Sequence, residues 1–233
     1  MAESAVGNQT RPVLLPILLC TRKGRWYVFE YAVSVRGRRG GWWGVAFVVT
    51  LTVGAAMVTL PTATQSGREI SAFYAAHAAV ILIQQLLGVV ALGFLIAFAM
   101  ALGARQRRWL MIGTVFLAIS ELATNIPPAV LAVTNLGPDG AHALTVFEDL
   151  ADMALSLSIA VFSVAATTDE VAWVRAAGLL VAALSVIRVV MTPLGIRAFD
   201  GVAPIAFLVL VLILSVRLLV GRSRPMPMGA APR

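Results

Sequence analysis

Long runs of apolar residues alternate with short polar segments along most of the chain. Six of these runs are long enough to cross a bilayer, for which a helix needs about 20 mostly apolar residues. They cover residues 42–60, 70–102, 110–136, 141–168, 173–195 and 204–220. The segments between them contain turn residues, such as the Gly-Pro-Asp-Gly sequence at 137–140. The pattern predicts an all-α, polytopic membrane bundle of six transmembrane helices.

The composition supports the same class of protein. Of 233 residues, 60% are hydrophobic and 12% are charged, whereas soluble domains are about half apolar and a quarter charged. A soluble enzyme, a disordered protein and a nucleic-acid-binding domain are therefore excluded. Cys20 is the only cysteine and Lys23 the only lysine. These two counts exclude an internal disulfide, an iron–sulfur cluster and a retinal Schiff base within the membrane.

The basic residues predict the orientation in the membrane. In a six-span topology, fifteen of the eighteen lysines and arginines flank one side, and only Arg68 and Arg197 flank the other. Cytoplasmic loops carry the excess of basic residues, so both termini are expected in the cytoplasm. Four tryptophans fall at the same edge of the spans, at positions 42, 43, 109 and 173. The abundance of arginine and alanine suggests a bacterial protein of the plasma (inner) membrane.

The segments outside the predicted membrane domain (41–221) are an N-terminal tail (1–40) and a short C-terminal tail (222–233), both expected in the cytoplasm. Within the N-terminal tail, the apolar stretch 13–20 is too short to span a bilayer and contains Pro16. The segment 26–35 is rich in aromatic residues and flanked by arginines. The tail is either flexible, or held on anionic lipid at the membrane surface, or a docking segment for a cytoplasmic protein.

Polar residues inside the spans are the best pointers to function, because each charge at the bilayer centre costs about 2.5–3.5 kcal/mol on insertion scales. Glu121 and Asn125 lie four residues apart and share a helix face. Pro127 and Pro128 follow, and each removes a backbone hydrogen bond and frees a carbonyl oxygen one turn earlier. The segment is either an ion or substrate site of the broken-helix kind, or a proline kink patched by Thr124 or by a neighbouring helix.

A second acidic group lies at the start of the fourth span. Glu148 and Asp152 share a face, and Asp149 lies between them. The acids are either embedded in the bundle or, for Glu148 and Asp149, part of a protruding solvated helix end. Arg188 in the fifth span lies at a similar depth, so we expect it to pair with one of the acids or to anchor an anionic ligand. Because the acids outnumber this arginine, the pattern favours an acid-rich cavity that opens outward.

The second span contributes further polar side chains. His77 and Gln84 are seven residues apart and align on one face. His77 and His142, the only histidines, both lie toward the outer side. Together with Asp149 they form a candidate set for a metal ion, for a haem or for pH sensing, although isolated histidines at interfaces are usually solvated. No cofactor can be named from the sequence.

Several features together resemble a group of small bacterial membrane proteins that are known as domains of unknown function. These features are the His-Ala pair near the start of the second span, the glutamate in the third, the acidic start of the fourth, and a Trp-led fifth span that ends in Pro-Leu-Gly. The resemblance covers about residues 42–220. The resemblance implies a six-helix fold, and it does not indicate any particular activity.

Three functions remain open. The first is binding or translocation of a small cation, a proton or a cationic amphiphile, with Glu121, Asn125, Glu148, Asp152, Arg188 and Gln84 as the binding residues. The second is a non-catalytic subunit or regulator that contacts a membrane or cytoplasmic protein through its N-terminal tail. The third is a membrane-embedded enzyme that acts on a lipid, with acids as general acid and base or as metal ligands. Frequent alanines and glycines also permit a homo-oligomer. The lipid bilayer is an expected partner, and nucleic acid is not.

Overall fold

The computed structural model describes residues 24–102, 107–134, 136–196 and 199–221. Side chains are described from Arg39 onward, with the exception of Arg107. The chain divides into two units, Met1–Arg36 and Gly37–Arg233. The helical bundle described below is the second unit, to which the later part of the first helix belongs.

The described residues form helices and no strands, which confirms the all-α class. The six α-helices are α1 (Gly24–Ala55), α2 (Gly67–Ala101), α3 (Arg107–Val133), α4 (Pro138–Thr167), α5 (Ala172–Met191) and α6 (Val202–Val220). A short 3₁₀ helix, η2 (Thr192–Leu194), extends the end of α5. Five of the helices, α2 to α6, are long and apolar enough to cross a membrane.

The expected boundaries agree with five helices to within a few residues and differ at the first. We expected a first span at 42–60, whereas α1 begins at Gly24 and ends at Ala55. Hydropathy detects the apolar part of a helix, so it gives no signal where a helix continues through the arginine-rich segment before residue 40. Residues 1–23, to which part of the predictions for the N-terminal tail applies, lie outside the described residues.

Local sequence signals explain several helix ends. Ser66 caps α2, because its hydroxyl accepts a hydrogen bond from the Glu69 amide while the Glu69 carboxylate accepts one from the Ser66 amide. This reciprocal capping box satisfies amides that have no partner within the helix. Pro138 occupies the first turn of α4, where its missing N–H costs nothing. Gly195 ends η2 with a φ of 77°, a left-handed conformation that glycine adopts without strain.

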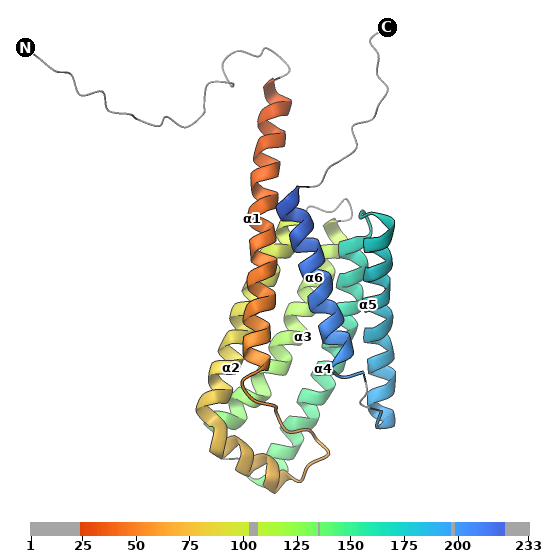
Figure 1. The fold of residues 1–233 in the computed structure, drawn as a ribbon. Coiled ribbons are helices and arrows are strands. Elements are labelled where there is room, and N and C mark those ends of the chain that lie inside the picture. The colour runs from red at the N-terminus through yellow and green to blue at the C-terminus, as the bar shows by residue number, and fades with distance from the viewer. Residues whose placement is uncertain (1–23, 103–106, 135, 197–198, 222–233) are drawn as a thin grey trace, which may run out of the picture. The chain divides into compact units, whose positions relative to one another are not determined.

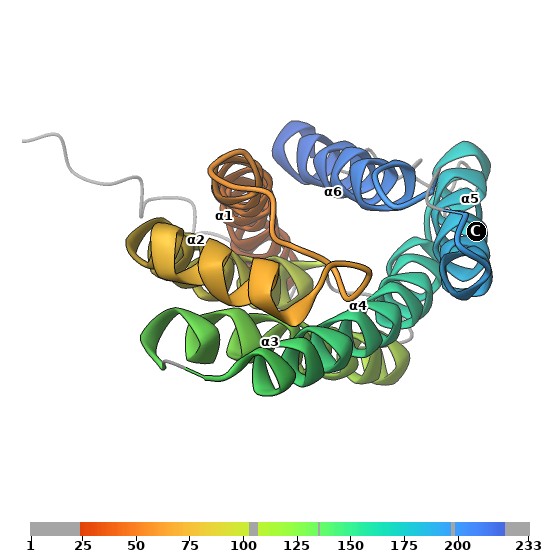
Figure 2. The same cartoon turned by 90° about the horizontal axis from the view of Figure 1, so that it is seen from below.

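The helices of the second unit run up and down between two ends (Figure 1). The lower end carries the α1–α2 loop, the α3–α4 turn and the segment between α5 and α6, and the first turns of α2 run across this end. Seen along the bundle, α3 and α4 lie on one side and α1 and α6 on the other (Figure 2). The helix α2 lies between α1 and α3, and α5 lies beside α4.

Small residues allow close approach between helices, as is common in membranes, where lipid gives apolar helices little reason to associate. An added Cβ at Gly44 of α1 would lie 2.0 Å from the Ser215 hydroxyl of α6. At Gly178 of α5 it would lie 2.1 Å from the Thr167 hydroxyl of α4. Both hydroxyls donate to the carbonyl four residues earlier in their own helix. They are therefore buried without losing a hydrogen bond.

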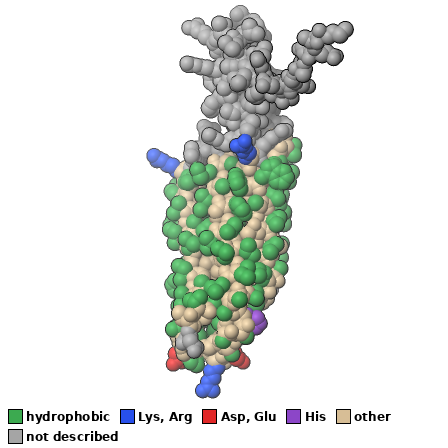
Figure 3. Space-filling view, turned by 90° about the vertical axis from the view of Figure 1, so that its left-hand side faces the viewer, with side chains coloured by type: hydrophobic (Ala, Val, Ile, Leu, Met, Phe, Trp, Pro, Cys, Tyr) green, Lys and Arg blue, Asp and Glu red, His purple; other side chains and the backbone are tan. Residues whose placement is uncertain are grey.

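The surface of the bundle suits an apolar solvent. Figure 3 shows hydrophobic side chains covering the wall between the two ends, with the charged side chains near the ends. Large apolar side chains on α2, α3 and α5 are more than half exposed, such as Leu86, Ile119 and Leu180. Soluble monomers rarely expose apolar patches this extensive. The surface is typical of a multi-pass membrane protein.

Candidate functional site

A cavity of about 160 Å³ lies among the first four helices. Its wall includes residues from the last turns of α1, the loop after it, and the middle parts of α2, α3 and α4. The lining residues are Leu51, Gly54, Ala55, Leu60, Gln84, Gln85, Gly88, Glu121, Thr124, Asn125 and Glu148. Four of the six side chains that the sequence marked as ligand-binding are therefore in one place. The presence of Leu60 in the wall means that the cavity extends toward the lower end of the bundle.

The Glu121–Asn125 pair forms the α3 side of the cavity. Asn125 Nδ2 donates to the Glu121 backbone carbonyl at 2.6 Å and to Glu121 Oε1 at 3.2 Å. The Thr124 hydroxyl donates to the same backbone carbonyl at 2.8 Å. The helix continues through Pro127 and Pro128 to Val133. The prolines remove the amides that would bond the Ala123 and Thr124 carbonyls, so the side-chain bonds to the Glu121 carbonyl do not replace the lost ones.

Glu148 enters the cavity from α4. One of its oxygens, Oε2, is buried and has no hydrogen-bond partner among the described residues. Gln84 Oε1 in α2 is also buried without a partner. The neighbouring Gln85 also lines the cavity and is 9% exposed. The cavity wall thus contains buried polar groups that the protein itself does not satisfy.

The charge of the cavity wall is one-sided. Glu121 and Glu148 both line it, and none of the lining residues described is a lysine, an arginine or a histidine. The last turn of α1 also contributes Gly54 and Ala55. A helix C-terminus carries partial negative charge. The two carboxylates and the helix end therefore favour a positive charge inside.

Gly88 permits α2 to approach Asn125. An added Cβ at this position would lie 2.6 Å from Asn125 Oδ1 and 3.4 Å from Asn125 Cγ. Only a glycine leaves room for the amide in its observed orientation. Gly88 thus helps to hold the Glu121–Asn125 pair in place.

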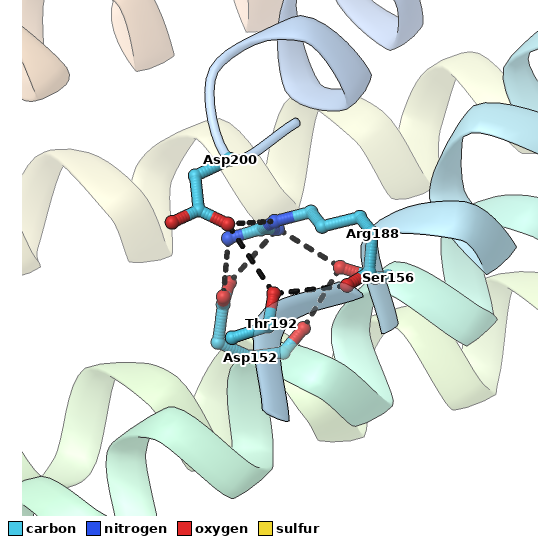
Figure 4. A network of polar contacts seen from close by, with 5 residues as sticks. All are labelled: Asp152, Ser156, Arg188, Thr192 and Asp200. Carbon is cyan, nitrogen blue, oxygen red and sulfur yellow. Dashed lines mark hydrogen bonds and ion pairs between the residues drawn. The ribbon is translucent and has the colours of Figure 1, made fainter. Parts of the chain in front are cut away.

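Arg188 forms a separate network with acids and hydroxyls (Figure 4). Its guanidinium pairs with both oxygens of Asp152 from α4, donates to Ser156 Oγ at 2.9 Å, and lies 3.6 Å from Asp200 Oδ1. Thr192 donates to Asp200 Oδ1 at 3.3 Å. The network joins α4, α5 and the segment before α6. The expected pairing of Arg188 with an acid is present, and the acid is Asp152.

Arg188 does not line the first cavity, because its guanidinium is bound within this network. Neither Arg188 nor Asp152 is among the cavity-lining residues. The arginine therefore does not neutralise Glu121 or Glu148 directly. The structure separates the predicted ligand-binding residues into a cavity set (Gln84, Glu121, Asn125 and Glu148) and an ion-pair set (Asp152 and Arg188).

A second cavity of about 270 Å³ lies between the start of α2 and the end of α3. Tyr74 lines it and is 1% exposed, and its hydroxyl makes no hydrogen bond of good geometry among the described residues. This hydroxyl interacts electrostatically with Glu148, which lines the first cavity. Tyr74 thus lies between the two cavities, since it lines the second and interacts with a carboxylate of the first.

The candidate metal ligands are not brought together. His77 is exposed, stacks on Phe73 with ring centroids 4.5 Å apart, and bonds the Phe73 carbonyl. His142 is exposed. Asp149 accepts a hydrogen bond from the Ala63 amide at 3.3 Å. No group of three or more His, Cys, Asp and Glu side chains suited to a metal occurs in the described parts of the chain.

Three polar residues of these sites were not selected from the sequence. Asp200 lies in a segment marked only by turn residues, and its contact with Arg188 arises from the return of the chain toward α6. Tyr74 lies one turn before Ala78 in an apolar helix, where a tyrosine gives no distinct signal. Gln85 directly follows Gln84. Two consecutive amides within an apolar span were the sequence signal that could have identified it as a cavity residue.

Comparison with known protein families, with curated proteins and with solved structures finds no match to this chain. The resemblance to small bacterial membrane proteins remains a prediction. The features of the molecule that bear on its function are therefore the two cavities and the Arg188 network.

Proposed function

We propose that this protein is a six-span protein of the plasma membrane, with both termini in the cytoplasm, and that its first cavity binds or translocates a small cation. Five helices that are apolar enough to cross a bilayer support the membrane assignment. The sixth span would be the apolar part of α1, which packs against α2 through Trp43 and Phe94, with ring centroids 5.6 Å apart.

The proposed orientation places the lower end of the bundle outside. Four exposed tryptophans, at positions 42, 43, 109 and 173, lie on the parts of α1, α3 and α5 near the upper end. Indole rings prefer the membrane interface. The six-span topology predicted from the sequence likewise puts most of the basic residues on the cytoplasmic side.

The observation that carries the cation proposal is the pair of carboxylates in one cavity without a basic side chain. Glu121 and Glu148 come from different helices and meet at this cavity. A buried carboxylate must be paired, hydrogen-bonded or protonated. Asn125 donates to Glu121 and the Tyr74 hydroxyl lies beside Glu148, but both groups are neutral. Since Arg188 is engaged by Asp152 and Asp200, a bound cation or proton would supply the missing positive charge.

The test is ligand-dependent thermal stability of the purified protein in detergent. A ligand that binds the folded state raises the unfolding temperature in a saturable way. We expect one of the chlorides of sodium, potassium, ammonium or methylammonium to do so at constant ionic strength. Glu121→Gln and Glu148→Gln should move this shift to much higher cation concentrations, because each keeps the shape of the side chain and removes its charge.

Asp139→Asn is the matched control, because Asp139 is an exposed carboxylate in the first turn of α4. This variant should retain the full shift. If no cation stabilises the protein in a saturable way, or if all three variants respond like the native chain, the proposal is wrong.

A further inference from the structure

The unsatisfied groups of the first cavity are hydrogen-bond acceptors placed on different helices. Glu148 Oε2 lies on α4 and Gln84 Oε1 on α2, and neither meets a donor at good hydrogen-bond geometry among the described residues. The Tyr74 hydroxyl interacts with Glu148, so a ligand in the cavity would share this carboxylate with Tyr74. A buried polar group without a partner is rare in proteins and calls for an explanation. A ligand that donates N–H or O–H groups would satisfy these acceptors.

The remainder of the wall favours an organic ligand over a bare metal ion. Leu51 from α1 and Leu60 from the following loop present apolar side chains. Hard metal ions in proteins take six or more oxygen ligands placed around them. The cavity instead combines a polar side, formed by α2, α3 and α4, with apolar surface from the leucines.

Quaternary ammonium ligands fit the wall poorly. They have no N–H group to donate to Glu148 or Gln84, and proteins recognise them mainly through aromatic rings. None of the described lining residues is aromatic. The acceptors and the apolar surface thus point to a cation that has both N–H donors and a short hydrocarbon part.

Building on the function proposed above, we infer that the ligand of this cavity is a small primary ammonium compound. Its ammonium group donates to Glu148 Oε2 and Gln84 Oε1, and its hydrocarbon part contacts Leu51 and Leu60. Glu121, oriented by the amide of Asn125, adds a second negative charge to the site. A cavity of about 160 Å³ admits a ligand of a few heavy atoms.

The experiment compares methylammonium, tetramethylammonium, sodium and potassium chlorides as stabilisers of the native protein in detergent. We expect methylammonium to raise the unfolding temperature in a saturable way, and tetramethylammonium, sodium and potassium to have no saturable effect. In Glu148→Gln, the methylammonium affinity should fall by about tenfold to a hundredfold, the usual effect of losing a charge-assisted hydrogen bond. Asp139→Asn should leave the affinity unchanged.

Gln84→Leu separates the hydrogen-bonding role of this site from its charge. It removes an amide and no charge, so it should weaken methylammonium binding while Glu121 and Glu148 remain. The exposed Gln65, replaced in Gln65→Leu, is the matched control and should bind as the native chain does.

The outcomes distinguish this inference from the function on which it rests. If sodium or potassium stabilises the protein in a saturable way and methylammonium does not, the inference is wrong. The proposed function, a cavity that binds a cation, would then still hold. An equal effect of tetramethylammonium, or an unchanged affinity in Gln84→Leu, would also overturn the inference. If none of the four cations acts, both the inference and the proposed function fail.

Discussion

Two glutamates of the same cavity have different surroundings. Glu121 accepts a hydrogen bond from Asn125, one turn away in its own helix. The Oε2 atom of Glu148 meets no donor at good geometry among the described residues, and the Tyr74 hydroxyl interacts with this carboxylate from the side of the second cavity. The first carboxylate is therefore held within its own helix, whereas the second has Oε2 left for a ligand. This difference assigns Glu121 to charge compensation and Glu148 to direct contact in the proposed site.

The orientation of the Asn125 amide depends on the absence of a Cβ atom at Gly88. Adding this one atom tests whether the orientation matters. In Gly88→Ala the new Cβ would lie 2.6 Å from Asn125 Oδ1, so the amide must leave the position from which it donates to Glu121. We expect this variant to lose cation-dependent stabilisation. It should also be less stable than the native protein by about 1–3 kcal/mol, the usual cost of overpacking a well-packed site.

Gly93→Ala is the control in the same helix, because a Cβ there meets nothing within 4 Å. It should stabilise α2 by up to about 1 kcal/mol, since alanine is the better helix former. Thermal unfolding with and without cation measures both effects. Equal behaviour of the two variants would show that Asn125 does not need its observed orientation.

Among the helices, those with clear apolar runs and capping signals were predictable from sequence. Ser66 and Glu69 mark the start of α2, and Pro138 marks the start of α4. The start of α1 was not predictable, because its first part is rich in arginine and leaves no hydropathy signal. The grouping of Glu121 with Asn125 followed from their spacing on one helix. Contacts between helices, such as that of Arg188 with Asp200, depend on the path of the chain and gave no such signal.

The Arg188 network joins three elements, and its stability effect is testable. Arg188 is the only basic partner that the structure assigns to Asp152 and Asp200 within its described parts. In Arg188→Gln, both carboxylates lose their positive partner. The guanidinium is 13% exposed but the carboxylates are 39% and 33% exposed, so the loss is smaller than that of a fully buried pair, about 3–5 kcal/mol. We expect a clear fall in the unfolding temperature of this variant.

Asp152→Asn should be milder, because Arg188 then keeps Asp200 and Ser156. Arg68→Gln, at an exposed arginine of α2, should leave the unfolding temperature unchanged. The order Arg188→Gln, Asp152→Asn, Arg68→Gln, from most to least destabilised, is the expected result. An Arg188→Gln variant as stable as Arg68→Gln would contradict a structural role for the network.

For the whole molecule, the separation of the charges into two sites limits the functions that fit. If Arg188 reached the first cavity, it would neutralise one glutamate and leave little need for a cation. Its engagement by Asp152 and Asp200 keeps the cavity acidic. The bundle therefore combines an ion-paired region that joins α4, α5 and the segment before α6 with an acidic cavity among α1 to α4. The polar residues could be selected from the sequence, but only the fold could divide them between these two sites.

The proposed orientation places the α1–α2 loop outside the cell and the α4–α5 turn in the cytoplasm. Cys20 is the only cysteine, so a Cys20→Ser background allows single cysteines to report on each side. Gln65→Cys lies in the α1–α2 loop and Val171→Cys in the α4–α5 turn, and both positions are exposed. In intact cells, a membrane-impermeant maleimide should label Gln65→Cys and not Val171→Cys. Val171→Cys, and Cys20 of the native chain, should react only after permeabilisation. The opposite labelling pattern would invert the topology, and the acidic cavity would then extend toward the cytoplasm rather than the exterior.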